Sequence, residues 1–171
     1  NRTLAPAAWL CDAYVKIIRG IPVVVLLLIF YFVIFTSSEG VEVAVLTFGV
    51  NSGAYMAELI RGGIHAVDQG QMEAGRSLGL SRLQTMERII FPQALRHILP
   101  AIGNEFIALI KETSVAGYVA VVDVTRAGNL VRNNTYDAVN SLMLVALTYL
   151  TLVLALTAVL ERFEKKLNKG R

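Results

Sequence analysis

Long apolar runs, separated by shorter polar stretches, dominate the pattern of this chain. A helix that crosses the roughly 30 Å hydrocarbon core of a bilayer needs about 20 mainly apolar residues. Four runs approach that length, at residues 22–36, 43–60, 98–118 and 137–160. The pattern therefore predicts an all-α fold, a polytopic bundle of transmembrane helices that forms one domain over residues 1–171.

The four runs differ in how polar they are. The last carries no charge from Ala138 to Leu160, so it is expected to span without help from other helices. The second is interrupted by small and polar residues, which let helix backbones approach each other in a bundle; they are Asn51, Ser52, Gly53 and Glu58. The third is expected to be one interrupted span, because the polar stretch 111–114 divides it.

The distribution of Lys and Arg predicts the orientation, because cytoplasmic loops are enriched in them. Thirteen of the sixteen lie before Pro22, in the 61–97 loop or after Leu160. We therefore expect these three segments, and with them the C-terminus, to be cytoplasmic. The sequence begins with Asn and shows no signal-peptide pattern, so we expect further sequence upstream, including one more span.

Composition excludes several other classes of protein. Hydrophobic residues make up 55% of the chain and charged residues 17%, against roughly 45–50% and 25% in soluble domains. The single cysteine, Cys11, excludes an internal disulfide, and no Cys/His group predicts a metal site. Because the basic residues flank apolar runs and form no patch interleaved with aromatics, we expect no nucleic-acid partner.

The loop between the second and third runs is more than thirty residues long, whereas helices in bundles are usually joined by about 2–8 residues. Asp68 is expected to cap a short helix that Gly79 ends. Ser81 and Gln84 form a capping box for a second helix, which Pro92 is expected to stop at the preceding residue. The loop thus predicts a helix, a Gly turn and a helix.

This loop resembles the EAA loop of bacterial ABC import permeases. The family pattern E-A-A-x3-G-x9-I-x-L-P is matched by Glu73-Ala74-Gly75-x3-Gly79-x9-Ile89-x-Phe91-Pro92. Two positions depart from it, since Gly75 replaces the second Ala and Phe91 replaces the Leu. Because Gly is about 1 kcal/mol less favourable than Ala in a helix, we expect Gly75 to loosen this helix.

Other strings resemble the polar amino acid subgroup of that family, the permeases for histidine, glutamine and arginine. In order they are Tyr14-Val15-x3-Arg19-Gly20-x-Pro22, Gly53-Ala54-Tyr55-x2-Glu58-x2-Arg61-Gly62-Gly63-Ile64, Pro92-Gln93-Ala94-x-Arg96-x3-Pro100 and Lys111-Glu112-Thr113-Ser114. The resemblance covers about residues 12 to 165. Five strings in the right order and spacing make it specific.

The resemblance implies a type I ABC importer permease in the bacterial inner membrane, with the family's first span absent from this sequence. It implies four kinds of partner: ATPase subunits, a second permease chain (identical or paralogous), a substrate-binding protein and lipid. The chain would not be an enzyme, because ATP and Mg²⁺ would be bound by the ATPase. The residues that would couple to it are Glu73, Ala74, Gly75, Ser77, Leu78 and Gly79.

Ionisable residues at membrane depth are costly unless they are paired or face water, so they are candidates for function. Lys111 follows Pro100 by about 16 Å of helix, near the depth of transporter sites. Lys111 with Thr113 and Ser114 would hold a substrate carboxylate, and Glu112 an ammonium. A structural role, or passage without a site, is the alternative. Asn104 either bonds another helix or lines the cavity.

Three other hypotheses remain open at this stage. An ABC permease for another small solute would share the EAA loop. A passive channel would not need an ATPase-docking loop, and a membrane anchor would not need polar residues at several depths.

Glu58 and Arg61 are expected to form an ion pair on one helix face. Asp123 and Arg126 either contact a binding protein or are solvated loop charges.

Overall fold

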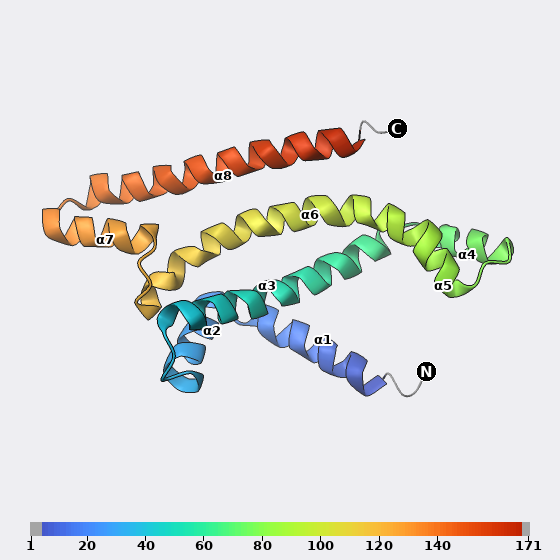
Figure 1. Ribbon diagram of the computed structural model, residues 1–171, viewed down its shortest axis with the longest axis horizontal. Coiled ribbons are helices and arrows are strands. Elements are labelled where there is room, and N and C mark those ends of the chain that lie inside the picture. Colours follow the sequence, from blue (N-terminus) through green and yellow to red (C-terminus); the bar gives the residue numbers. More distant parts are fainter. Residues whose placement is uncertain (1–4, 169–171) are drawn as a thin grey trace.

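The structure is a computed structural model that describes residues 5–168, in which every regular element is a helix (Figure 1). Lys169 and Arg171, part of the predicted cytoplasmic tail, lie outside these residues. The elements are α1 (Ala5–Gly20), α2 (Val23–Ile29), the π-helical turn η2 (Phe30–Ile34), α3 (Gly40–His65), α4 (Gln69–Ser77), α5 (Arg82–Thr85), the π-helical turn η3 (Met86–Ile90), α6 (Phe91–Glu112), the 3₁₀ helix η4 (Thr113–Val119), α7 (Val124–Thr135) and α8 (Ala138–Asn168).

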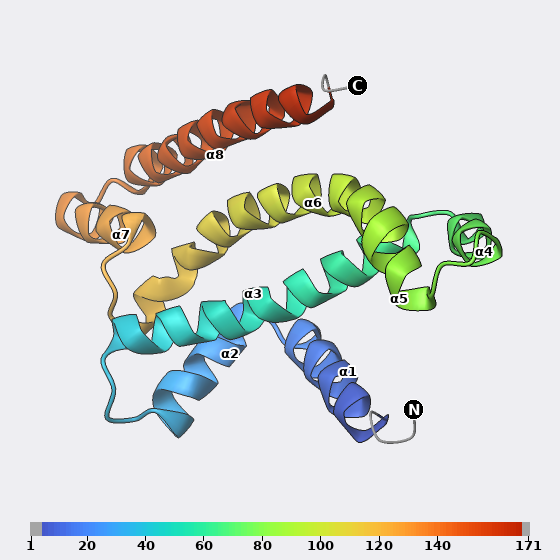
Figure 2. The ribbon, with the colours of Figure 1, turned by 45° about the vertical axis from the view of Figure 1, so that its right-hand side comes forward.

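Three long helices, α3, α6 and α8, extend along the molecule (Figures 1 and 2). The short helices α4 and α5 lie at one end of them, and α7 lies at the opposite end. The first two helices pack on α3, where the Tyr14 hydroxyl donates a hydrogen bond of 2.6 Å to the Val50 carbonyl. The prediction of an all-α transmembrane fold is confirmed.

The core has two parts, and α3 and α6 contribute to both. The part next to α4 and α5 is formed by Val67, Ile90, Ala94 and Ile98. Gly63 of α3 is buried there, and a Cβ atom at this position would meet the Ile98 side chain. Glycine therefore sets the distance at which the two helices pack.

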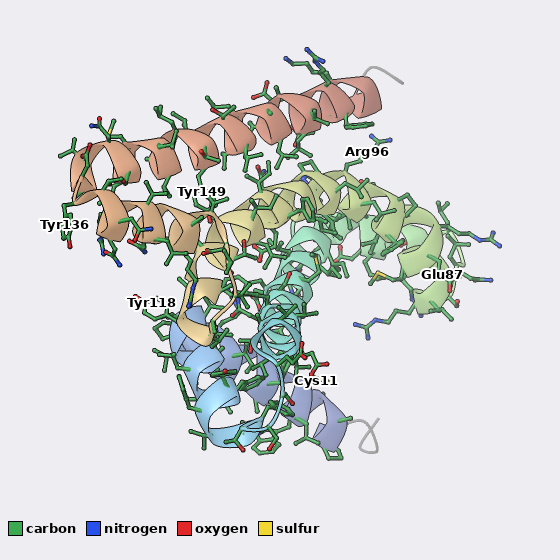
Figure 3. All side chains as sticks on the ribbon, turned by 60° about the vertical axis from the view of Figure 1, so that its left-hand side comes forward. Cys11, Glu87, Arg96, Tyr118, Tyr136 and Tyr149 are labelled. Atoms are coloured by element: carbon green, nitrogen blue, oxygen red, sulfur yellow. The ribbon has the colours of Figure 1, made fainter. Side chains whose placement is uncertain are left out.

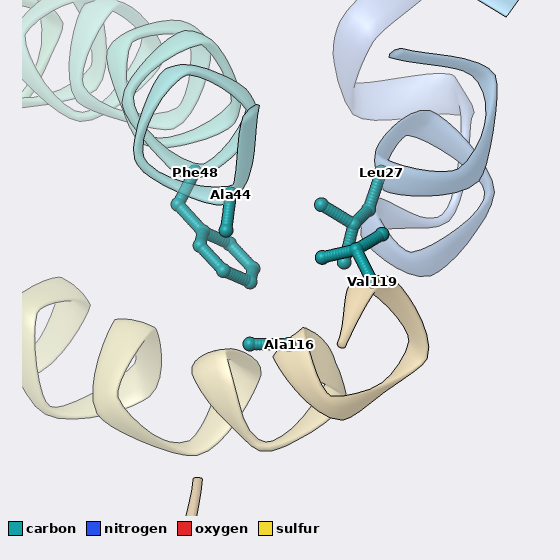
Figure 4. Packing of buried hydrophobic residues seen from close by; sticks show 5 residues of the cluster. All are labelled: Leu27, Ala44, Phe48, Ala116 and Val119. Atoms are coloured by element: carbon teal, nitrogen blue, oxygen red, sulfur yellow. The ribbon is translucent and has the colours of Figure 1, made fainter. Parts of the chain in front are cut away.

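The second part of the core lies near the other end of α3 and joins α2, α3, α6 and η4 (Figure 4). It contains Leu27, Ala44, Phe48, Ala116 and Val119. The first residue of α3, Gly40, contacts the Val119 carbonyl so closely that no side chain would fit. The start of α3 is thereby fixed against η4.

The prediction that Pro92 ends the second loop helix is wrong. The backbone stays helical from Arg82 through Glu112, as α5, η3 and α6 follow one another without a break. Proline lacks an N–H and is tolerated in the first turn of an α-helix, and Pro92 lies in the first turn of α6. The wider π-helical turn before it, closed by the Phe91 N–H to the Met86 carbonyl, accommodates the change.

Within residues 5–168, the helices α3 and α8 are long and apolar enough to cross a membrane. The first contains the predicted span 43–60, and the second contains the predicted span 137–160 except for its first residue. The predicted span 22–36 coincides with α2 and η2, which together with α1 form a pair bent by 104° that is a candidate broken span. The charged α6 does not meet the same criterion. The spans 22–36 and 98–118 therefore stay predictions.

Candidate functional site

The first half of the EAA-type loop has the predicted caps. Asp68 begins α4, and its Oδ1 accepts a hydrogen bond of 2.7 Å from the Gly70 N–H. At the other end, the Leu80 N–H bonds to the Gly75 carbonyl and the Gly79 N–H to the Arg76 carbonyl. This is a Schellman motif, which needs a left-handed residue. Gly79 has φ of 85°, so its predicted role is confirmed.

The second half of the loop begins at the predicted capping box. The Gln84 N–H donates to the Ser81 hydroxyl at 3.2 Å, and the Ser81 N–H donates to the Gln84 side chain at 2.8 Å. Thr85, fully buried, packs against Gly75, where any Cβ would meet its side chain. The sequence predicted that Gly75 loosens α4. It did not predict this contact, in which the missing side chain of Gly75 lets α4 pack closely on α5.

The predicted coupling residues surround an exposed surface at this end of the molecule. Glu73, Ala74 and Ser77 are exposed on α4, and Leu78 is 81% exposed although it is apolar. Beside them lies a hollow of about 490 Å³, lined among others by Val67, Met72, Glu73, Arg82, Met86 and Ile90. Exposed leucines next to an open, partly apolar hollow are typical of a docking surface for another protein.

Charged residues connect α1 to the end of α3 near this loop. Arg19 lies 3.6 Å from Glu58 and its guanidinium lies over the Tyr55 ring, 5.1 Å from the centroid. Arg61 lies 3.5 Å from Asp12. The expected Glu58–Arg61 pair is therefore wrong: both residues pair with α1 instead. Asp12 also lies 2.7 Å from Lys16 on the same helix.

A polar contact joins α3 and α6 at the depth where the sequence predicts a substrate site. Asn51 is 2% exposed, and its Nδ2 donates a hydrogen bond of 3.2 Å to Glu112 Oε2. Seven residues, about two turns, separate Glu105 from Glu112, so the two carboxylates lie on the same side of α6. Both are partly buried. The α3-facing side of α6 is thus acidic.

The five predicted substrate residues do not converge on one point. Asn104 and Lys111 are exposed and share a different side of α6 from Glu112, because they are also seven residues apart. The Thr113 hydroxyl bonds to the Ile110 carbonyl at 2.7 Å. Ser114 lies farther on, in a pocket next to α7. A single chain therefore presents these groups on three surfaces.

A groove runs along α3 beside these residues. It has a volume of about 510 Å³ and is lined among others by Phe48, Gly49, Ser52, Gly53, Met56 and Thr113. Gly49 leaves room for the groove, since a Cβ atom at this position would meet no other atom within 4 Å. Among the predicted substrate residues, Thr113 lies directly in the groove.

Asp123 and Arg126 are part of a folded element and not of a solvated loop. Asp123 Oδ1 caps α7 by accepting the Arg126 N–H at 2.7 Å. The Arg126 side chain donates a hydrogen bond of 2.6 Å to the Gly117 carbonyl. The two residues thus fix η4 against α7. Figure 3 shows Tyr118 and Tyr136 at the end of the molecule opposite Glu87.

Sequence reasoning named Asn51 only as a polar residue within a span and did not find its partner. No local pattern gives that partner, because 61 residues separate Asn51 from Glu112. It also did not find Gly49 and Met56 of the groove. The sequence evidence for the groove was the spacing of small residues along 43–60. This spacing indicates that one face of the helix packs closely, but it does not determine which element lies against that face.

The Asn51–Glu112 contact generates a stability prediction. Asn51→Leu leaves a partly buried carboxylate without its donor, so we expect a loss of about 1–3 kcal/mol of stability. Adding Glu112→Leu should restore part of that loss, because the unpartnered group is removed as well. Thermal unfolding of the purified protein in detergent measures both. If Asn51→Leu unfolds at the wild-type temperature, the contact contributes nothing.

Comparison with known proteins agrees with this geometry. The profile of the family described as "Binding-protein-dependent transport system inner membrane component" matches residues 5–169. The probable glutamine ABC transporter permease protein GlnM of Bacillus subtilis (strain 168) is 37% identical over 168 residues, which cover 96% of this chain and 78% of the relative.

Two further comparisons give the same result. The arginine transport system permease protein ArtQ of B. subtilis (strain 168) is 37% identical over 172 residues, covering 98% of this chain and 78% of the relative. The crystal structure of an amino acid ABC transporter with histidines contains a chain with a TM-score of 0.90 and 36% identity, covering 95% of this chain and 78% of that one. The chain thus spans about three quarters of the length of these relatives.

It belongs to the binding-protein-dependent transport system inner membrane components. These are the permease subunits of ABC importers, in which separate subunits hydrolyse ATP.

Proposed function

We propose that this permease subunit carries polar amino acids into the cell. Its relatives named for glutamine and arginine support the substrate class. The observation that carries the proposal is the path of the chain from α3 through α4 and α5 into α6. This path connects α3 and α6, which hold polar groups at the expected membrane depth, to the exposed helical loop formed by α4 and α5.

The loop is the surface on which we place the ATPase. Glu73 is exposed on α4 and Leu78 is exposed directly after it, and α4 packs on α5 through Gly75 and Thr85. Because α5 continues into α6 without a break, movement of the docked loop is transmitted directly to the polar residues of α6. ATP and Mg²⁺ would be bound by the partner, so this chain would change only between inward-open and outward-open arrangements.

The substrate path would follow the groove on α3 and the exposed side of α6. Glu112 is held by Asn51, so its carboxylate is fixed in place as a candidate partner for an ammonium group. Lys111 and Asn104 are exposed on another side of α6, where they would face a second permease chain. A complete site would then need groups from the interface between two such chains.

The partners and the orientation belong to the same proposal. The Lys/Arg distribution supports a bacterial inner-membrane protein with the α4–α5 loop and the C-terminus in the cytoplasm. The surface of η4 and α7 would then face outward, where a soluble substrate-binding protein delivers the amino acid. Dependence of uptake on ATP and on that protein would separate this function from a passive channel.

Reversing the charge of Glu73 should uncouple transport. Glu73→Lys places a cation where the ATPase is expected to accept an acid, and like charges brought together at an interface cost several kcal/mol. Uptake by proteoliposomes containing the complete transporter should fall at least about tenfold. The control Glu87→Lys makes the same exchange on η3, outside the hollow, and should change uptake little. Equal effects of the two variants would contradict the docking assignment.

Lys111 should be needed for substrate and not for folding. Lys111→Met keeps the length and apolar surface of the side chain but removes a charge-assisted bond of roughly 1.5–3 kcal/mol. Each 1.4 kcal/mol is a factor of ten, so amino acid uptake should fall at least about tenfold while basal ATP hydrolysis persists. Lys165→Met, at an exposed lysine near the end of α8, is the control. Normal uptake by Lys111→Met at matched protein levels would make Lys111 a structural lysine.

A further inference from the structure

A pocket that contains charged side chains lies beside η4 and α7, apart from the groove on α3. Its volume is about 230 Å³, several times the roughly 30 Å³ that one water molecule occupies in the liquid. It lies between η4 and the first turns of α7. We call it the outer pocket, and its lining includes Ser114, Gly117, Tyr118, Asp123, Arg126 and Asn129.

The outer pocket contains one acid and one base, and neither is neutralised by an ion pair. Asp123 uses Oδ1 to cap α7, whereas its Oδ2 is buried and has no hydrogen-bond partner among residues 5–168. Arg126 donates one bond to the Gly117 carbonyl, out of the five N–H donors of a guanidinium. Over the same residues, no carboxylate lies within 4.0 Å of it.

These groups fit a small molecule that carries both charges. A buried carboxylate oxygen without a donor is unfavourable, and an ammonium group would supply the missing donor. A guanidinium with free donors binds a carboxylate. The Ser114 hydroxyl and the Asn129 amide can each donate or accept a further bond. With one positive and one negative side chain, the pocket matches a zwitterion better than an anion or a cation.

We propose that the outer pocket binds the α-ammonium and α-carboxylate groups of an amino acid, with Asp123 holding the first and Arg126 the second. The proposal rests on the proposed function, since it adds a binding site at the outward end of the same route. It is separate from the candidate at Lys111, because only Ser114 is shared with the residues predicted from the sequence.

One wall of the pocket is the short helical segment that follows α6. It is a 3₁₀ helix, η4, which ends at Ala120 in a left-handed conformation with φ of 66°. Because Asp123 Oδ2 is buried, the proposal requires that η4 shifts relative to α7 when an ammonium group binds. The bond from Arg126 to the Gly117 carbonyl is the contact that changes in that shift.

A tryptophan placed in the pocket tests the proposal directly. Tyr118 is 66% exposed at the rim, so Tyr118→Trp introduces a fluorophore there. Trp9→Phe removes the single native tryptophan. The complete transporter in nanodiscs, without binding protein, is titrated with L-glutamine and with L-arginine. We expect a saturable fluorescence change with at least one of them, and none with glutarate, which lacks the ammonium group.

Two matched variants test whether amino acid binding depends on the negative charge of Asp123. Asp123→Asn keeps a good N-cap but removes the negative charge, and it should weaken the apparent affinity at least about tenfold. Asp137→Asn makes the same exchange at the carboxylate that caps the start of α8, outside the pocket, and should leave the affinity within about twofold. A second reporter, Val122→Trp, replaces an exposed residue that precedes Asp123 in the sequence. It checks that a tryptophan at position 118 has not blocked the site.

Each outcome decides a separate question. No saturable signal from either reporter, in a transporter that still takes up amino acids, would overturn the outer pocket. Equal weakening by Asp123→Asn and Asp137→Asn would overturn the role of Asp123 and with it the proposal. Absence of ATP-dependent uptake of any amino acid in wild-type proteoliposomes would instead contradict the proposed function.

Discussion

The close packing of α3 against α6 is the constraint on which the rest of the molecule depends. At one end Gly63 admits the Ile98 side chain, and toward the other end Asn51 bonds to Glu112. The two contacts are different in kind. Small residues allow dispersion forces to act between backbones in lipid, whereas the polar contact satisfies groups for which the bilayer offers no partner.

This pair of helices connects the α4–α5 loop to the end of the protein formed by η4 and α7. On one side α3 and α6 are joined through α4 and α5, and on the other α6 continues into η4, which packs on the start of α3 through Gly40 and Val119. The pair is therefore held at both ends. Under the proposed function, a displacement of the loop would be transmitted along α6 to the acidic side chains Glu105 and Glu112, and then to the 3₁₀ segment that borders α7.

Sequence reasoning predicted the features that depend on neighbouring residues, such as helix caps. It failed for features that depend on contacts between residues far apart in the sequence. The caps at Asp68, Gly79 and Ser81 follow from local hydrogen bonding, and all three are confirmed. The end assigned to the helix before Pro92 was wrong, because a π-helical turn absorbs the proline. The partner of Glu58 was also wrong, since Arg19 on another helix competes with Arg61. The predicted substrate residues, Asn104 and the four consecutive residues 111–114, lie on different sides of α6 and η4 and remain a prediction.

The account requires that the α3–α6 pair crosses the membrane, with the α4–α5 loop inside and α7 outside. The most direct test uses single cysteines at the exposed residues Arg82 and Asn134, in a Cys11→Ser background, and a membrane-impermeant thiol reagent. In intact cells the reagent should label the cysteine at 134 and reach the one at 82 only after the membrane is opened. Labelling of both positions from the same side would contradict the account.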